Sequence, residues 1–215
     1  PETCEILWNG RSVSSEPVGR YVDRDILRVA LGALPKGKSE LIVHMPFAPK
    51  TDVEAMYLLG DFGVRVDGDR AVATAPVREM GFGDWVRQGL PFYGGNVTYH
   101  LSVEGTGDPI RVALNRFRAP VIAVDLDGER QGVIAISPYA VTTKPLSPGK
   151  HALDITVYGN RFNTFGALHN VDSGEDVYCS PNFWRSTGAL WAYEYQLRST
   201  GPLKSPDIDR VQTRK

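Results

Sequence analysis

The chain has 215 residues, of which 42% are hydrophobic and 23% charged, and its 24 basic and 25 acidic side chains leave a formal net charge of −1. This composition excludes an intrinsically disordered chain, and the length fits one large all-β domain. The balanced charge argues against a nucleic-acid partner, and the sequence contains no stretch of about 18 apolar residues that would indicate a membrane span.

The first residue is Pro1 rather than Met, which we interpret as the sign of a fragment of something longer. Two cysteines, Cys4 and Cys179, lie far apart in the sequence. Sequence alone does not decide whether they pair, and two unpaired, partly buried thiols are the commoner expectation. The redox compartment therefore stays open, with an extracytoplasmic location favoured.

Short runs rich in β-branched and aromatic residues follow one another along the chain, and each predicts a strand. In the run 152–158, Leu153, Ile155 and Val157 alternate with polar residues, which is typical of a strand with one buried face. The predicted strands cover residues 26–31, 40–47, 53–59, 64–66, 71–75, 97–103, 110–114, 121–126, 132–136, 152–158 and 192–198.

Turns that contain glycine or proline separate these runs, and the clearest hairpin is VIAVDLDGERQGVIAI, with Asp127-Gly128 as its tight turn. Strands at roughly 8–12-residue spacing, without a long helical period, predict an antiparallel β-sandwich or jelly roll. We expect a single domain over residues 1–203 and a polar C-terminal tail over residues 204–215.

Metal and cofactor signals are weak. The four histidines, His44, His100, His151 and His169, lack the spacing of a zinc site, so structural roles are expected for them. The sequence has no Gly-x-Ser-x-Gly elbow and no glycine-rich phosphate loop, so we expect no cofactor. A structural calcium ion is a more modest hypothesis, with Asp172, Glu175 and Asp176 as its carboxylates, although their spacing is not that of an EF-hand.

Glycoside hydrolysis would need two carboxylates about 5 to 10 Å apart, which sequence spacing cannot show. Several acids lie near aromatic residues or glycines, but in a chain with 25 acidic residues such neighbours are common. Surface and turn-capping roles therefore suit these acids better than catalysis. They are Glu54, Asp61, Asp84, Glu175 and Asp176.

Five motifs in order resemble a known family. Together they are similar to the non-catalytic β-sandwich, of the galactose-binding-like jelly-roll type, of large glycoside hydrolases related to the family 2 sugar-binding domains. The hairpin of that family usually carries Asn-Gly where this chain has Asp127-Gly128, a change that suits the same turn. The motifs are EAMYLLGDFGV (54–64), GDWVRQGLPFYGGNVTYH (83–100), VDLDGERQGVIAISPY (124–139), LSPGKHALDITVYGNRFNTFGALH (146–169) and SPNFWRSTGALWAYEYQLRSTGPL (180–203).

The resemblance implies an accessory module, either carbohydrate-binding or structural, of a larger glycoside hydrolase. It also implies that the catalytic carboxylates lie in another domain, so this chain is not expected to be an enzyme on its own. Its expected partners are a carbohydrate or the catalytic domain of the same chain, with no nucleic acid and no membrane. Two alternatives remain open, namely a free-standing lectin-like sandwich and a small sandwich enzyme with its own carboxylate pair.

The segment 83–100 offers the chemistry of a sugar-binding platform, in which aromatic faces are combined with planar polar groups. Its candidate ligand-contacting residues are Trp85, Arg87, Gln88 and Tyr93. The competing interpretation is that these aromatic residues pack one end of the sandwich, while the Gly-Gly pair makes a bulge or a turn.

A second aromatic set lies near the end of the chain. Trp184 and Trp191 flank a predicted loop, so they are the better candidates for contacting a ligand or a neighbouring domain. Tyr193 and Tyr195 alternate with Ala192 and Glu194, which predicts that both tyrosines share one packed face of a strand.

Overall fold

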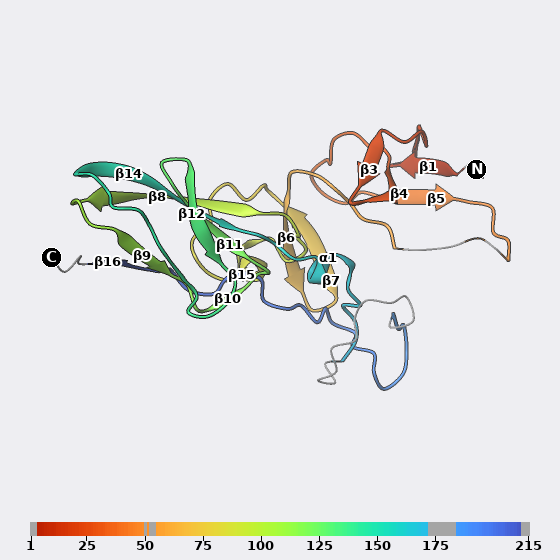
Figure 1. The fold of residues 1–215 in the computed structure, drawn as a ribbon. Coiled ribbons are helices and arrows are strands. Elements are labelled where there is room, and N and C mark those ends of the chain that lie inside the picture. The colour runs from red at the N-terminus through yellow and green to blue at the C-terminus, as the bar shows by residue number, and fades with distance from the viewer. Residues whose placement is uncertain (1–3, 50, 52–54, 172–183, 212–215) are drawn as a thin grey trace. The chain divides into compact units, whose positions relative to one another are not determined.

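The structure, a computed structural model, describes residues 4–49, 51, 55–171 and 184–211 (Figure 1). The chain divides into two compact units, Pro1–Leu59 and Gly60–Lys215. The sequence predicted one domain over residues 1–203, and the structure divides the chain differently. The reason is strand pairing, because each described strand before Leu59 pairs only with other strands of the same unit.

The first unit is built from short antiparallel strands. A three-stranded sheet has the order β2-β1-β5, and β3 and β4 form a separate hairpin. None of the described residues of this unit is buried, so the described part of the unit contains no hydrophobic core of its own. The strands are β1 (Glu5–Trp8), β2 (Arg11–Val13), β3 (Gly19–Tyr21), β4 (Asp23–Arg28) and β5 (Leu41–His44).

The second unit contains two larger antiparallel sheets. The four-stranded sheet has the order β12-β11-β14-β8, from β8 (Val97–Gly105), β11 (Ile122–Leu126), β12 (Glu129–Ile134) and β14 (Gly149–Val157). The three-stranded sheet has the order β13-β9-β16, from β9 (Ile110–Ala113), β13 (Ala140–Thr142) and β16 (Asp207–Arg210).

One hydrophobic core joins these two sheets. On β14, Leu153, Ile155 and Val157 are buried, as their alternation predicted. Strands β9 and β13 supply the opposite side of the same core, so the antiparallel β-sandwich is confirmed. The core residues are Trp85, Tyr99, Ile110, Val112, Leu114, Ile122, Val124, Leu126, Ile134, Val141, Leu146, Leu153, Ile155 and Val157.

Smaller elements complete this unit. They are the hairpin of β6 (Gly63–Asp67) and β7 (Arg70–Thr74), the pair β10 (Phe117–Arg118) and β15 (Gly201–Pro202), the 3₁₀ helix η1 (Trp85–Gln88) and the single-turn helix α1 (Phe162–Phe165). Neither helix in the described part of the chain has the length and apolar character that a membrane span requires.

The predicted polar tail over 204–215 is partly a strand. Residues 207–210 form β16, which pairs with β9 and places Ile208 opposite Val112. A hydrophobicity pattern could not predict this strand, because most of its side chains are polar and a ladder of backbone hydrogen bonds does not require apolar residues. The strand is recognised only from its pairing with β9.

Two of the predicted strands do not form in the described residues. Residues 55–59, the described part of the predicted strand 53–59, form no strand, and neither do residues 192–198. In the second segment the backbone N–H groups bond to loops, since Tyr195 donates to Gly68 and Gln196 donates to Leu168. The prediction that Tyr193 and Tyr195 share a strand face is therefore wrong.

Candidate functional site

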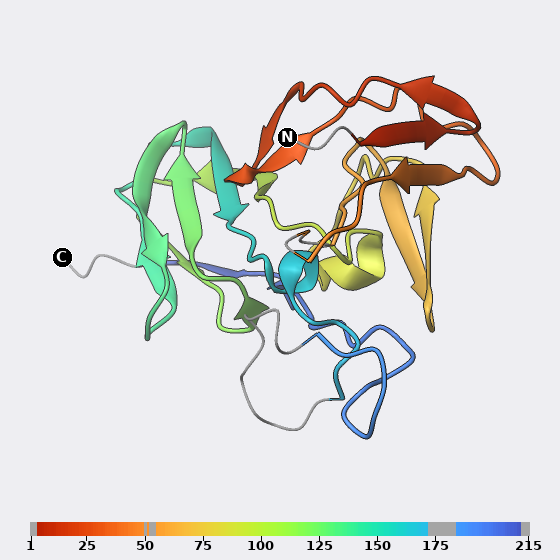
Figure 2. The same cartoon turned by 90° about the vertical axis from the view of Figure 1, so that its right-hand side faces the viewer.

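Three loop segments of the second unit meet beside the sandwich core. They are residues 84–96, 158–171 and 184–203. The first two lie side by side where the Thr164 hydroxyl of α1 donates to the Phe92 carbonyl at 2.8 Å (Figure 2). The first and third meet where the Trp85 N–H donates to the Thr200 carbonyl at 3.0 Å. Most of the residues that the sequence singled out lie on these segments.

A buried amide fixes the third segment to the second. Asn163 is 3% exposed, and its Nδ2 donates to the Arg198 carbonyl at 2.7 Å while its Oδ1 accepts from the Arg198 N–H at 3.0 Å. The side chain thereby imitates a neighbouring strand and satisfies both polar backbone groups of Arg198. The loops are therefore held by specific bonds rather than by chain connectivity alone.

Trp85, a predicted ligand contact, belongs to the core instead. Its side chain is 0% exposed, and its Nε1 donates to the Tyr99 hydroxyl at 2.9 Å. Asp84 caps η1, because its Oδ1 accepts from the N–H groups of Val86 and Thr200 at 3.1 Å each. A tryptophan without exposed surface cannot stack on a sugar, so burial overturns its predicted role.

Gln88 and Arg87 differ in exposure. The Gln88 amide turns inward, where Oε1 accepts from the Gly81 N–H at 3.0 Å and Nε2 donates to the Asp84 carbonyl at 3.4 Å. Arg87 is exposed in the last turn of η1. Of these two predicted contacts, Arg87 alone presents its polar group outward.

Tyr93 is an exposed aromatic ring with a fixed orientation. It is 42% exposed, its hydroxyl donates to the Asn96 carbonyl at 3.1 Å, and its ring meets that of Trp85 edge-on with 6.3 Å between centroids. The ring lies close over Gly95, where an added Cβ would come within 2.5 to 3.0 Å of Tyr93 atoms. A ring held in this way can bind a sugar face without losing rotamer entropy.

Gly94, like Gly95, lies where a side chain would clash with neighbouring groups. An added Cβ there would lie 2.9 Å from the Thr164 hydroxyl, 3.0 Å from the Arg161 Cγ and 3.2 Å from the Asn160 carbonyl. The Gly-Gly pair therefore permits two close approaches, by the Tyr93 ring on one residue and by the 160–164 loop on the other. The structure brings Arg161, which the sequence interpretation did not single out, next to this pair.

The second aromatic set lies on the third segment. Trp184 is 46% exposed, and Trp191 is half-buried, with its ring edge-on to Tyr193 at 5.6 Å between centroids. Trp191 also forms an isolated bridge with Asn170. Both tryptophans lie outside regular strands, as predicted, and Trp184 is the more accessible of the two.

A packed triad of rings links this set to the first loop. The Tyr195 ring contacts Phe92 edge-on at 5.4 Å between centroids and His169 at 4.6 Å. The Nδ1 of His169 lies 3.1 Å from the Ala192 carbonyl. The ring contacts among the described residues do not join Tyr93 to Trp184 or Trp191, so the two exposed aromatic sets share a scaffold rather than one surface.

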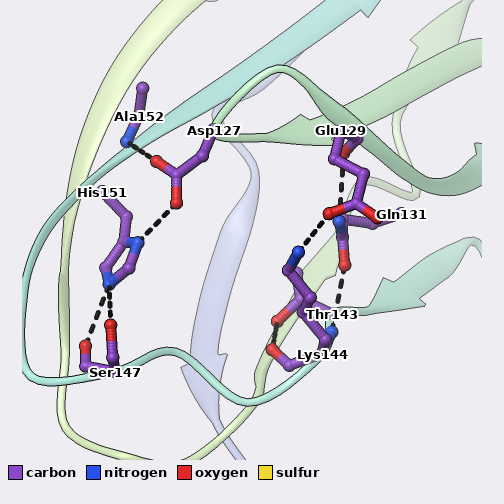
Figure 3. A network of polar contacts seen from close by, with 8 residues as sticks. All are labelled: Asp127, Glu129, Gln131, Thr143, Lys144, Ser147, His151 and Ala152. Carbon is purple, nitrogen blue, oxygen red and sulfur yellow. Dashed lines mark hydrogen bonds and ion pairs between the residues drawn. The ribbon is translucent and has the colours of Figure 1, made fainter.

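A second polar cluster, at the turn between β11 and β12, resembles a Ser-His-Asp triad (Figure 3). His151 Nδ1 lies 2.6 Å from Asp127 Oδ2, and its Nε2 lies 3.5 Å from the Ser147 hydroxyl and 2.9 Å from the Ser147 carbonyl. The hydrogen bond to Asp127, and next that to the Ser147 carbonyl, raise the pKa of His151, while the same imidazole lowers the pKa of Asp127.

These contacts disfavour the role of general base. Both nitrogens of His151 face acceptors, which favours the protonated ring and agrees with its raised pKa. A base that activates a serine needs an unprotonated nitrogen, and the Ser147 hydroxyl lies at the outer limit of hydrogen-bond distance. The cluster is therefore a structural clamp that joins the Asp127 turn, the start of β14 and the turn at Ser147.

The rest of Figure 3 ties the two sheets together. Gln131 of β12 accepts from the Lys144 N–H at 3.0 Å, and Lys144 also forms an ion pair with Glu129. The Thr143 hydroxyl accepts from the Ile110 N–H at 3.1 Å and donates to the Lys144 carbonyl at 2.8 Å. The Gln131 and Glu129 contacts thus join β12 of the four-stranded sheet to Lys144, just after β13 of the three-stranded sheet, whereas the Thr143 bond to Ile110 links the end of β13 to β9 within that second sheet.

A charged row crosses the outer face of the four-stranded sheet. Asp154 lies between His100 and Asp125 in the register, and Asp125 lies opposite Arg130. His100 Nδ1 is 2.8 Å from Asp154, and Arg130 Nε is 2.6 Å from Asp125. Adjacent carboxylates on neighbouring strands repel, and this repulsion is offset by the Arg130 guanidinium on one side and by the His100 contact on the other.

The candidate acids of the sequence interpretation do not form a catalytic pair in the described residues. Asp84 is a helix cap, and Asp61 forms an exposed ion pair with Arg78 at 3.3 Å. Glu54, Glu175 and Asp176 lie outside the described residues, as do Asp172 of the calcium hypothesis and Cys179. Cys4 is a free, half-buried thiol, and the described residues contain no cluster that could hold a metal ion.

Comparisons with known proteins give partial matches only. No family model matches the chain. The curated proteins contain no match either. Among solved structures, two crystal structures of a GH2 β-galacturonidase from Eisenbergiella tayi match, one bound to glycerol and one bound to galacturonate. Their sequence identities to this chain are 20% and 19%, respectively, and both have a TM-score of 0.37. Each match covers 69% of this chain and 22% of the galacturonidase. A rhamnosidase from Novosphingobium sp. PP1Y matches with TM-score 0.41 and 16% identity, over 81% of this chain and 17% of that one. The chain thus spans about a fifth of the length of these proteins.

Proposed function

We propose that this chain is a non-catalytic, carbohydrate-binding accessory module of a larger glycoside hydrolase. The sequence motifs suggest the galactose-binding-like jelly-roll family, and the antiparallel sandwich is compatible with it. The observation that carries the proposal is the exposed, fixed ring of Tyr93. Its hydroxyl donates to the Asn96 carbonyl, its ring packs edge-on with Trp85, and it lies close over Gly95. Rigid, exposed aromatic rings are suited to bind the apolar faces of sugars.

Two polar arrangements of the described residues bear on catalysis. His151 faces an acceptor at each ring nitrogen, and on the outer sheet face Asp125 pairs with Arg130 while Asp154 lies beside His100. Neither arrangement presents an acid and a base to one substrate bond. As the sequence resemblance implies, we expect the hydrolytic residues of the parent enzyme in a different domain.

The test is a glycan-array screen of the purified 215-residue chain, together with Tyr93→Ala and Trp184→Ala variants whose folding is checked by circular dichroism. Binding by the wild type that is lost in Tyr93→Ala is expected, and loss in Trp184→Ala would place a further contact on the third segment. Arg118→Gln, at an exposed position on β10, is the control and should bind like the wild type.

Two results would contradict the proposal. Absence of binding across the array would make the module a structural buttress for a catalytic domain. Hydrolysis of aryl glycosides by the purified chain would show that it carries its own catalytic groups.

A further inference from the structure

The side chain of Arg161 passes beside the loop of residues 84–96, called here the Tyr93 loop. Arg161 is exposed, and within the described residues its side chain makes neither a hydrogen bond nor an ion pair. By contrast, Arg130 and Arg78 on the same unit each bind a carboxylate. All five N–H donors of Arg161 are thus available to a ligand.

The backbone of Arg161 is fixed even though its side chain is exposed. Its carbonyl accepts from the N–H groups of Thr164 at 3.2 Å and Phe165 at 3.0 Å, which closes the turn of α1. Asn160 Oδ1 accepts from the Phe162 N–H at 3.0 Å on the other side of Arg161. The guanidinium therefore extends from a rigid point rather than from a free loop.

The stem of Arg161 packs against the residue that follows Tyr93. The position of a Cβ added to Gly94 lies 3.0 Å from Arg161 Cγ. The next residue, Gly95, carries the Tyr93 ring above it. The Tyr93 ring and the Arg161 stem therefore lie over two adjacent residues, Gly95 and Gly94, and each close approach depends on the missing side chain of the glycine beneath it.

The local charge favours an anionic group. The chain as a whole is close to neutral, with 24 basic and 25 acidic residues, so general attraction for anions is absent. In the Tyr93 loop the acid is Asp84, and its Oδ1 already accepts two backbone N–H groups. Arg161 thus meets no competing carboxylate from this loop, and guanidinium binds carboxylate through two parallel hydrogen bonds.

We propose that Tyr93 and Arg161 form a subsite for a uronic acid, in which the pyranose ring stacks on Tyr93 and its carboxylate binds the Arg161 guanidinium. This rests on the proposed carbohydrate-binding function and specifies the class of sugar. Arg161 distinguishes an acidic sugar from the neutral sugar of the same stereochemistry.

The test compares sugars that differ only at C6. Methyl glucuronide is titrated against methyl glucoside, and methyl galacturonide against methyl galactoside, at low salt, with ¹⁵N-¹H chemical shifts of the purified chain as the readout. The acidic member of at least one pair should bind about tenfold more tightly or better, and should shift the amides of Gly94 and Gly95. Arg161→Gln should abolish this preference, while Arg118→Gln should keep it.

The outcomes separate this proposal from the proposed function. Equal binding within each pair, or a preference that survives Arg161→Gln, overturns the uronic acid subsite and leaves carbohydrate binding intact. Failure of all four sugars to bind also overturns the subsite, and the glycan array then decides the wider function. Unchanged spectra for Arg161→Gln apart from its neighbours show that the variant is folded.

Discussion

His151 Nδ1 lies 2.6 Å from Asp127 Oδ2, so a residue at the start of β14 and a residue of the β11–β12 turn form one ion pair. Asp127 also accepts from the Ala152 N–H at 2.9 Å through its other oxygen. A two-residue turn thereby becomes an anchor for the neighbouring strand.

This pair predicts a pH-dependent stability. The pKa of His151 is raised, so its contribution to the free energy of unfolding is complete below about pH 6.5 and is lost as the pH rises through the folded pKa. The pKa of Asp127 is lowered, so its contribution is present above about pH 4 and is lost as the pH falls through the folded pKa. The His151–Asp127 pair should therefore stabilise the protein most between these two pH limits.

Urea unfolding at pH 6 and at pH 9 tests this prediction. The free energy of unfolding should fall more between these pH values in the wild type than in Asp127→Asn, whose side chain still suits the turn. Equal losses would contradict the assignment.

Gly105 is predicted to resist any side chain. A Cβ at this position would overlap the Ser147 carbonyl oxygen and lie 2.9 Å from the His151 ring. Because the first of these atoms belongs to the backbone, we expect Gly105→Ala to lower the free energy of unfolding by about 1–3 kcal/mol. Ser102→Ala, at an exposed position of the same strand, should change it by less than about 0.5 kcal/mol. Chemical denaturation measures both, and similar values for the two variants would show that the site can relax.

The buried bond between Trp85 and Tyr99 predicts a cost for removing one hydroxyl. Tyr99→Phe leaves the Trp85 Nε1–H without its acceptor in the core, which should cost about 1–3 kcal/mol of unfolding free energy. Tyr139→Phe, at a 36% exposed position, is the matched control and should be close to neutral. A neutral Tyr99→Phe would mean that another acceptor reaches the indole.

Asn163 is predicted to control the order of the third loop segment. Asn163→Ala removes two hydrogen bonds to Arg198 and should cost about 2–3 kcal/mol in unfolding free energy. Hydrogen exchange of the Arg198 amide should accelerate beyond the amount that the global loss explains. Asn115→Ala, at an exposed position, should leave that amide unchanged. If the Arg198 amide keeps its protection from exchange in Asn163→Ala, Asn163 does not hold this segment in place.

Local patterns in the sequence predicted much of the sandwich. The alternation over 152–158 placed Leu153, Ile155 and Val157 in the core, as found, because a period of two has a single meaning in a strand. The Asp127-Gly128 turn is confirmed too, since both residues have positive φ, 50° and 80°, and such turns are specified by the two residues themselves.

The candidate site was harder to predict because its meaning depends on distant partners. Nothing local to Trp85 distinguishes a core residue from an exposed platform, and its burial follows from Tyr99 and Gly201. Arg161 has no signal at all in its own segment, because its significance comes from contact with Gly94. The Gly-Gly pair was a visible signal, yet the sequence could not show which side chains approach it.

The pairing of β16 with β9 has a consequence for how the protein folds during synthesis. β9 is the central strand of its sheet, and residues 207–210 supply one of its two neighbours. One edge of β9 therefore stays open until nearly all of the 215 residues have left the ribosome. Contacts of such long sequence separation form slowly, and an open strand edge promotes aggregation. Pairing of residues 207–210 with β9 thus covers a strand edge through which the nascent chain could associate wrongly with other chains.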